Sequence, residues 1–292
     1  MLNNFSGQIF FEEKLAPYTS WKVGGECQAL VMPKSIEDIQ LVLDYCNENK
    51  VPYLVLGNGS NILKSDEYFD GIVINISKTL NSITIEEDKV TVGSGCMLPK
   101  LAFHLAKNEI GDFAFYAGIP GTVGGGIVMN AGSAGKETKD VLLSVTYIDE
   151  TGRIIKEPAS KLDLDFRRSK FQGRKKIIVS AEFKKEYRAK DEALTATKEI
   201  ADRRRKKFPL NVPTAGSTFK SPTGGPYPGK IIEDLGLKGT THGKAKISER
   251  HGNWIENIGE ASANDINELI NYVQHIVKKK TGIDLEVEVI RV

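Results

Sequence analysis

The feature that most constrains the fold of this sequence is a stretch in which glycine recurs at short intervals. Residues 118–132 read GIPGTVGGGIVMNAG, an apolar run without a charged side chain. Glycine costs roughly 0.5–1 kcal/mol relative to alanine inside a helix or strand, so such a cluster indicates unusual backbone angles or a group pressed against the backbone. Two interpretations follow, a sharp structural crossover or a cradle for phosphate.

The familiar phosphate-binding motifs do not match this stretch. Its spacing is G-x-x-G-x-x-G-G-G, without the Lys-Ser or Lys-Thr of a P-loop and without the G-x-G-x-x-G of a dinucleotide-binding fold. A second glycine loop lies upstream, where the apolar run 53–56 predicts a buried strand. It consists of Gly57, Asn58, Gly59, Ser60 and Asn61.

A loop of this kind presents successive backbone N–H groups, which can bind an oxyanion. The alternative is a tight turn, which by itself explains a single Gly-x-Gly. A third short loop follows at Gly93-Ser94-Gly95. Three such loops in one half of the chain favour a dinucleotide whose pyrophosphate is gripped by loops rather than by one helix terminus.

Composition narrows the classes of protein. The 292 residues suffice for one large or two ordinary domains, and 40% hydrophobic with 27% charged residues is typical of a globular protein. No apolar stretch approaches the roughly 18 residues of a membrane span, and residues 1–15 lack the pattern of a signal peptide. The net charge of +2 argues against a nucleic-acid partner. Three cysteines without metal-ligand spacing suit the reducing cytoplasm, where we expect the protein.

The chain reads as an α+β protein in two parts. Hydrophobic periodicity predicts a helix at 35–50, a hairpin within 82–92, a helix at 98–108, strands within 141–156 and 175–187, a helix at 264–280 and a final strand at 283–292. Charge density changes near residue 188, which predicts domains at 1–188 and 189–292. The basic run 203–207 is either the solvated end of a helix or a contact to an anionic ligand.

Adjacent arginines in LDFRRSKF are candidates for anion binding, because a guanidinium can bind a carboxylate or phosphate through two hydrogen bonds. On an extended chain Arg167 and Arg168 point to opposite faces, so only one of them serves a given site. The alternative is a surface ion pair with Asp163 or Asp165.

Other polar groups leave alternatives open. Ser217 in AGSTFK lacks the second glycine of a G-x-S-x-G nucleophile motif, which disfavours a serine hydrolase and leaves proton transfer or turn capping. Glu286 and Glu288 share one face of the predicted last strand, and periodicity does not distinguish them. The four histidines show no ligand spacing, so no metal site is predicted.

These segments, in this order, resemble the UDP-N-acetylenolpyruvoylglucosamine reductase family over nearly the whole chain. The resemblance rests on TSWKVGG (19–25), LGNGSN (56–61), AGIPGTVGGGIVMNAG (117–132), FRRS (166–169), AGSTFK (215–220), ISERHGNWIEN (247–257) and LEVEV (285–289). It is closest to the family's shorter branch.

The resemblance implies an FAD-binding domain of the vanillyl-alcohol-oxidase (PCMH) type followed by a smaller α/β substrate-binding domain. It implies non-covalent FAD, NADPH as co-substrate, a UDP-sugar substrate and a monomer. Both glycine loops would hold FAD, and in the second the implied residues are Gly118, Ile119, Pro120, Gly121, Thr122, Gly124 and Gly125.

The resemblance also implies three catalytic residues. Arg167 would hold the enolpyruvyl carboxylate, Ser217 would donate a proton, and Glu288 would be the family's glutamate. Phe166 and Asn58 depart from the family's usual tyrosine and glycine. The alternatives are another flavoprotein of the same fold and a nucleotide-binding module without catalysis.

Overall fold

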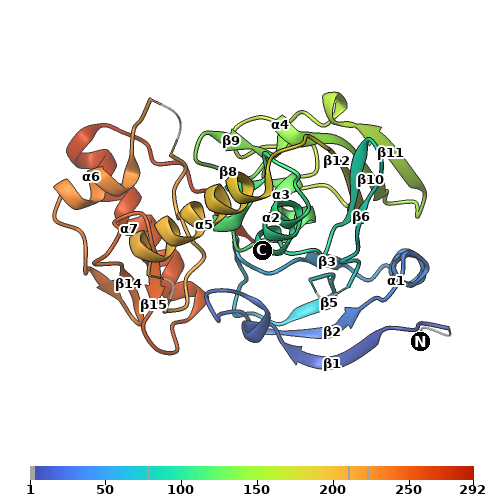
Figure 1. Ribbon diagram of the computed structural model, residues 1–292. Coiled ribbons are helices and arrows are strands. Elements are labelled where there is room, and N and C mark those ends of the chain that lie inside the picture. Colours follow the sequence, from blue (N-terminus) through green and yellow to red (C-terminus); the bar gives the residue numbers. More distant parts are fainter. Residues whose placement is uncertain (1–3, 78, 210, 222–223) are drawn as a thin grey trace. The chain divides into compact units, whose positions relative to one another are not determined.

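The chain folds into two compact units, shown in the computed structural model of Figure 1. The structure describes residues 4–77, 79–209, 211–221 and 224–292. The first unit comprises residues up to 12, 28–58 and 70–204, and the second comprises 13–27, 59–69 and 205–292. Each unit is therefore built from segments that are distant in sequence.

Two sheets form the framework of the first unit. A five-stranded antiparallel sheet has the order β11-β10-β12-β7-β6. A four-stranded sheet has the order β1-β2-β5-β3, with β3 parallel to β5. The strands are β1 (Gln8–Lys14), β2 (Glu26–Met32), β3 (Tyr53–Leu56), β5 (Phe69–Asn75), β6 (Ile83–Ile85), β7 (Lys89–Gly93), β10 (Leu142–Ile148), β11 (Ile154–Pro158) and β12 (Ile177–Lys184).

Helices cover these sheets where the sequence provides a cap and an apolar stripe. The helix α1 (Ile36–Asn49) begins at Ser35, whose side chain accepts the N–H of Asp38 at 3.2 Å. Its buried residues pack with strands of the four-stranded sheet in one apolar cluster. The remaining elements of this unit are α2 (Leu98–Lys107), η2 (Ala114–Gly118), α3 (Val123–Val128), β8 (Gly132–Ser133), β9 (Lys136–Glu137), α4 (Thr138–Val141), η3 (Ala159–Lys161) and α5 (Lys190–Lys207).

The second unit is organised around the long helix α7 (Ala263–Thr281). Ser262 and Asp265 form a reciprocal capping box at its start, and Gly282 ends it in the left-handed conformation. Its buried stripe lies in the core of this unit. Around it are η1 (Ala16–Tyr18), β4 (Ile62–Leu63), α6 (Pro228–Asp234), β13 (Thr241–His242), β14 (Ala245–Ile247), β15 (Ile255–Asn257) and β16 (Ile290–Arg291), with β4 and β16 parallel.

The last predicted strand forms only in part. Of residues 283–292, Ile290 and Arg291 form a strand, and Val287 forms an isolated bridge with Phe219. The predicted alternation of faces nevertheless holds, because Leu285 and Val289 are buried in the core. The paired residues are interrupted between Val287 and Ile290, so the segment does not form one continuous strand.

The compact units also differ from the predicted boundary at residue 188. The first unit continues to Arg204, because Ile200 and Ala201 of α5 pack against its core. The second unit includes residues 13–27, since Trp21 Nε1 donates to the carbonyl of Ile255 at 2.8 Å. A local change of composition does not reveal a partner more than two hundred residues away.

Candidate active site

In the first unit, the two glycine loops lie against each other. Asn58 Nδ2 donates to the carbonyl of Pro120 at 2.6 Å. A side chain at Gly57 would place its Cβ 2.7 Å from the hydroxyl of Thr122, so glycine is required there by a neighbour within the protein. The two glycine-rich segments thus contact each other in the first unit.

The remainder of the upstream loop belongs to the second unit. Gly59 has φ +60°, and its Cβ would lie 2.2 Å from the carbonyl oxygen of Tyr18. The side chain of Asn61 donates to the carbonyl of Glu288 at 3.1 Å, and Ser60 is half-buried. Protein contacts therefore account for Gly59 and for one polar group of Asn61.

Helix α3 uses its glycines for different purposes. A Cβ at Gly124 would lie 3.2 Å from Ser94 Cβ, and one at Gly126 would lie 3.1 Å from a methyl group of Leu98. These two glycines allow close packing inside the protein. Thr122 caps the helix, because its hydroxyl accepts the N–H of Gly125 at 3.3 Å.

Gly125 is different, because it is exposed and its missing side chain faces open space. A Cβ there would meet only the Thr122 hydroxyl, at 3.6 Å. At Gly118 a Cβ would make ordinary contacts with Ile200 and Arg204, at 3.5 and 3.6 Å. Burial lowers the pKa of the Arg204 guanidinium to about 10, so this member of the basic run is no solvated helix end.

The FRRS segment is a tight turn rather than the extended chain that the sequence predicts. Arg168 N–H donates to Asp165 O at 2.9 Å and Asp165 N–H to Arg168 O at 3.1 Å, which places Phe166 and Arg167 at the centre of the turn. Arg167 has φ +53°, in the left-handed region that favours glycine. The backbone of Arg167 is therefore in a conformation that is strained for a residue with a side chain.

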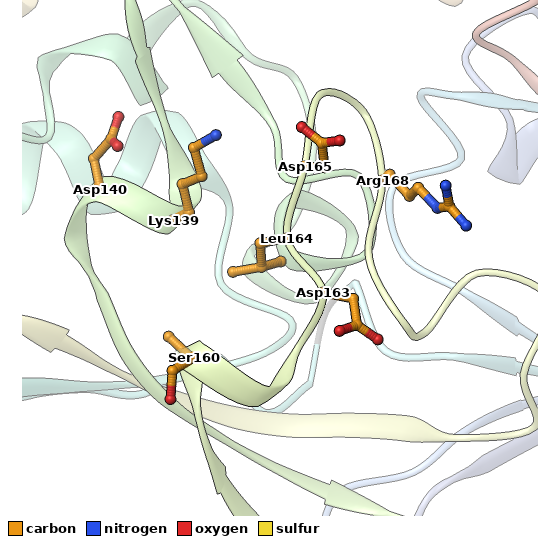
Figure 2. A pocket seen from close by; sticks show the side chains of 8 residues that line it. Lys139, Asp140, Ser160, Asp163, Leu164, Asp165 and Arg168 are labelled. Atoms are coloured by element: carbon orange, nitrogen blue, oxygen red, sulfur yellow. The ribbon is translucent and has the colours of Figure 1, made fainter.

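The two arginines enter different surroundings. The guanidinium of Arg167 donates from Nη2 to the carbonyl of Gly132 at 3.1 Å, and its Nη1 lies 4.0 Å from a carboxylate oxygen of Glu137. Arg168 instead lines an open cavity of about 700 Å³. Figure 2 shows Lys139 on one side of this cavity and the loop that carries Arg168 on the other.

In the second unit, Ser217 and Glu288 lie on neighbouring segments. The N–H of Glu288 donates to the carbonyl of Thr218 at 2.8 Å, and Ser217 forms an isolated bridge with Trp254. Both Ser217 and Glu288 are half-buried. The segments that carry Ser217 and Glu288 are thus neighbours although seventy residues of chain separate them.

The structure distinguishes the two glutamates that periodicity leaves equivalent. The Glu286 side chain is 71% exposed and pairs with Lys220. Glu288 is partly buried beside the segment that contains Ser217.

Asn253 is a residue that sequence reasoning missed. Its side chain accepts the N–H of Phe219 at 2.9 Å and donates to the carbonyl of Phe219 at 2.8 Å, which fixes the segment after Ser217. The only signal in the sequence is an asparagine within ISERHGNWIEN.

Within the described parts of the chain, no group of three or more histidine, cysteine, aspartate or glutamate side chains could hold a metal ion. Among the described helices, none is both long and apolar enough to cross a membrane.

Comparison with known proteins agrees with this arrangement. Residues 27–157 match a family model described as an FAD binding domain, and residues 208–292 match the C-terminal domain of UDP-N-acetylenolpyruvoylglucosamine reductase. A curated protein of that name from Clostridioides difficile is 40% identical over 290 residues, covering 99% of this chain and 95% of its own length. The chain belongs to the UDP-N-acetylenolpyruvoylglucosamine reductase family. Another relative, from Caldanaerobacter subterraneus subsp. tengcongensis, is 38% identical over 283 residues, 97% of this chain and 93% of that protein.

A solved structure of a family member has the same fold. The reductase from Thermus caldophilus superposes with a TM-score of 0.82 at 32% identity, over 98% of both chains. The predicted α+β class with an FAD-binding domain is therefore confirmed, and the protein is an FAD-dependent oxidoreductase. The exposed backbone at Gly125, with open space where a Cβ would stand, fits a flat ring system approaching α3.

Proposed function

We propose that this protein reduces UDP-N-acetylglucosamine enolpyruvate to UDP-N-acetylmuramate, a precursor of bacterial peptidoglycan, with NADPH as the source of hydride. Its membership of the reductase family supports this reaction. The structural observation that supports it most directly is the hydrogen bond of 2.8 Å that joins the segments carrying Ser217 and Glu288. It makes neighbours of the two segments that carry the proposed proton donor and the proposed carboxylic acid.

Bound FAD would supply the hydride carrier between NADPH and the substrate. The residues proposed to hold it are Gly57 to Asn61 and, in the second loop, Gly118 to Thr122 with Gly124 and Gly125. The first loop contains neither histidine nor cysteine, so we propose non-covalent attachment. The functional division at residue 188 stays a proposal, with cofactor binding before it and substrate binding after it.

Addition of hydride to the terminal carbon of the enol ether leaves negative charge on the adjacent carbon and its carboxylate. Arg167 binds that carboxylate, and its fixed positive charge stabilises the enolate most strongly when the charge is fully developed. Glu288 contributes a hydrogen bond to the enolate. Ser217 then donates a proton to the carbon, so that one hydride and one proton have added across the double bond and NADPH has become NADP⁺.

We also propose a monomeric, cytoplasmic enzyme. Cys27, Cys46 and Cys96 are buried cysteines that form no disulfide, and burial raises the pKa of Cys46 to about 11, which suits a reducing compartment. One chain supplies all the polar groups that the proposed reaction uses.

The decisive experiment separates the two half-reactions by anaerobic stopped-flow absorbance of the flavin. Ser217→Ala should leave reduction by NADPH almost unchanged, because the proton is needed only after hydride has reached the substrate. Reoxidation by the enolpyruvyl substrate should slow by roughly 10²–10⁴, the usual loss of a general acid. Equal damage to both half-reactions would show that Ser217 is structural.

Glu288 has a matched control two residues away. Glu288→Gln should slow reoxidation selectively, whereas Glu286→Gln should have little effect, because the side chain of Glu286 is 71% exposed and pairs with Lys220. A visible spectrum recorded before and after NADPH, and again after substrate, tests the reaction class. A flavin that NADPH reduces but the enolpyruvyl substrate does not reoxidise would indicate a different substrate.

A further inference from the structure

A buried polar network lies beside the turn that carries Arg167. Asn130 is completely buried and has φ +39°. Its Nδ2 donates to Glu137 Oε2 and to the carbonyl of Asp165, each at 3.0 Å, and its Oδ1 accepts the N–H of Lys139 at 2.9 Å. One side chain therefore ties the segment 130–139 to the first residue of the turn.

This network holds the Glu137 carboxylate at a defined position. Oε2 accepts from Asn130 and lies 2.9 Å from Nζ of Lys139, and Glu137 also forms a reciprocal capping box with Asp140 at the start of α4. The remaining oxygen, Oε1, lies 4.0 Å from Nη1 of Arg167. A side chain with this many attachments loses little further entropy when it acts on a neighbour.

Arg167 needs such a neighbour, because its side chain is only 18% exposed. A guanidinium removed from water is costly unless charge and hydrogen bonds compensate it. The carbonyl of Gly132 accepts from Nη2 at 3.1 Å, the ring of Phe166 lies 4.9 Å away, and Glu137 supplies the negative charge at Nη1. The carbonyl of Gly132 and the carboxylate of Glu137 thus lie at two different nitrogens of the guanidinium and restrict its orientation.

We propose that Glu137, held by Asn130, is the positioning residue that orients the Arg167 guanidinium toward the carboxylate of the substrate. The inference rests on the proposed role of Arg167. Glu137 itself touches neither substrate nor cofactor in this scheme. Orientation matters because a displacement of about 1 Å in a charged clamp can cost on the order of 10² in rate.

The test measures the two half-reactions of the flavin in Glu137→Gln, which keeps the size of the side chain and removes its charge. Reoxidation by the enolpyruvyl substrate should slow by about 10- to 100-fold, whereas reduction by NADPH stays unchanged. Glu137→Asp is the second variant. Aspartate is a good N-cap and keeps α4, but its carboxylate is one methylene too short to reach Arg167, so the same selective loss is expected.

Asp112→Asn is the matched control. Asp112 pairs with Lys136, the residue before Glu137, at 2.6 Å on the surface of the same unit. This variant removes a neighbouring ion pair without changing the charge beside Arg167, and both half-reactions should stay as in the wild type. A loss in the control equal to that in Glu137→Gln would overturn the proposal.

A double-mutant cycle distinguishes a positioning role from a general structural one. If Glu137 acts through Arg167, Glu137→Gln should cause no further slowing of reoxidation in a protein that already carries Arg167→Ala. Additive losses, or equal slowing of both half-reactions, would overturn the inference. If Arg167→Ala slows reoxidation and neither Glu137 variant does, the inference fails while the proposed function stands. If Arg167→Ala itself has no effect, the proposed role of Arg167 is wrong.

Discussion

Replacement of Gly125 by alanine should change the stability of the protein in opposite directions with and without FAD. Gly125 lies in the first turn of α3, is exposed, and has no atom within 3.5 Å of the position of a Cβ. In a helix interior alanine is more favourable than glycine by about 1 kcal/mol. Because α3 is short, we expect Gly125→Ala to stabilise the apoprotein by roughly 0.5–1 kcal/mol. The midpoint of thermal unfolding of the apoprotein should therefore rise by roughly 1–4 °C.

The same methyl group should weaken the binding of FAD if the cofactor lies against this backbone. Forcing one methyl group into a close-packed contact costs about 1–3 kcal/mol, equivalent to a Kd raised roughly 5- to 150-fold. Because a ligand stabilises the folded state in proportion to the logarithm of its affinity, the holoprotein should unfold at a lower temperature than wild-type holoprotein.

Gly124→Ala and Gly126→Ala provide internal comparisons in the same helix. Their Cβ atoms would meet Ser94 and Leu98 at 3.2 and 3.1 Å, so the cost of overpacking should offset the gain in helix propensity, and neither apoprotein should be stabilised as Gly125→Ala is. Differential scanning fluorimetry and titration with FAD measure both quantities. Unchanged FAD affinity in Gly125→Ala would refute the placement of the cofactor against α3, and a less stable apoprotein would refute the open space at this glycine.

Two further predictions concern charge. Arg167→Lys should slow steady-state turnover by about tenfold or more, because an ammonium cannot reproduce a two-bond fork, whereas Arg168→Lys should stay close to wild type; equal losses would contradict the assignment. At Glu182, burial alone would raise the pKa, but hydrogen bonds from Lys156, Lys89 and a serine outweigh it and lower the pKa to about 2. This depressed pKa stabilises the fold fully above the ordinary value of 4.5 and loses its effect as the pH falls toward 2. At pH 7, Glu182→Gln should therefore unfold at a lower urea concentration than the wild type, and the difference between the two midpoints should shrink on acidification. A difference that does not depend on pH would contradict this prediction.

Elements with local signals could be predicted from the sequence. Helix α7, capped by Ser262 and ended by Gly282, lies within one residue of the predicted range 264–280 at each end, and the hairpin of β6 and β7 pairs as predicted. Each of these signals acts within a few residues, so the surrounding protein has little power to override it.

Elements that depend on distant partners could not be predicted. The turn at Arg167 requires a left-handed arginine, and its geometry is fixed by Asn130 and by Gln172, which donates to the carbonyl of Arg167 at 3.0 Å. Nothing in the local sequence signals this turn, because the position that favours glycine holds arginine. The composition of the second unit is equally non-local, because the hydrogen bond between Trp21 and Ile255 joins two segments of that unit that are distant in sequence.

The glycine cluster shows where sequence and structure are both needed to infer a ligand site. Counting glycines does not separate Gly124 from Gly125, since both lie in the same apolar run. The structure separates them, because Gly124 and Gly126 have close neighbours within the protein. Gly125 has neither a close neighbour nor a positive φ, so nothing within the chain requires glycine there. A glycine that the fold does not need, at an exposed helix start beside a second glycine loop, is best explained by a group that approaches from outside. Because the family is FAD-dependent, we propose that this group is the cofactor.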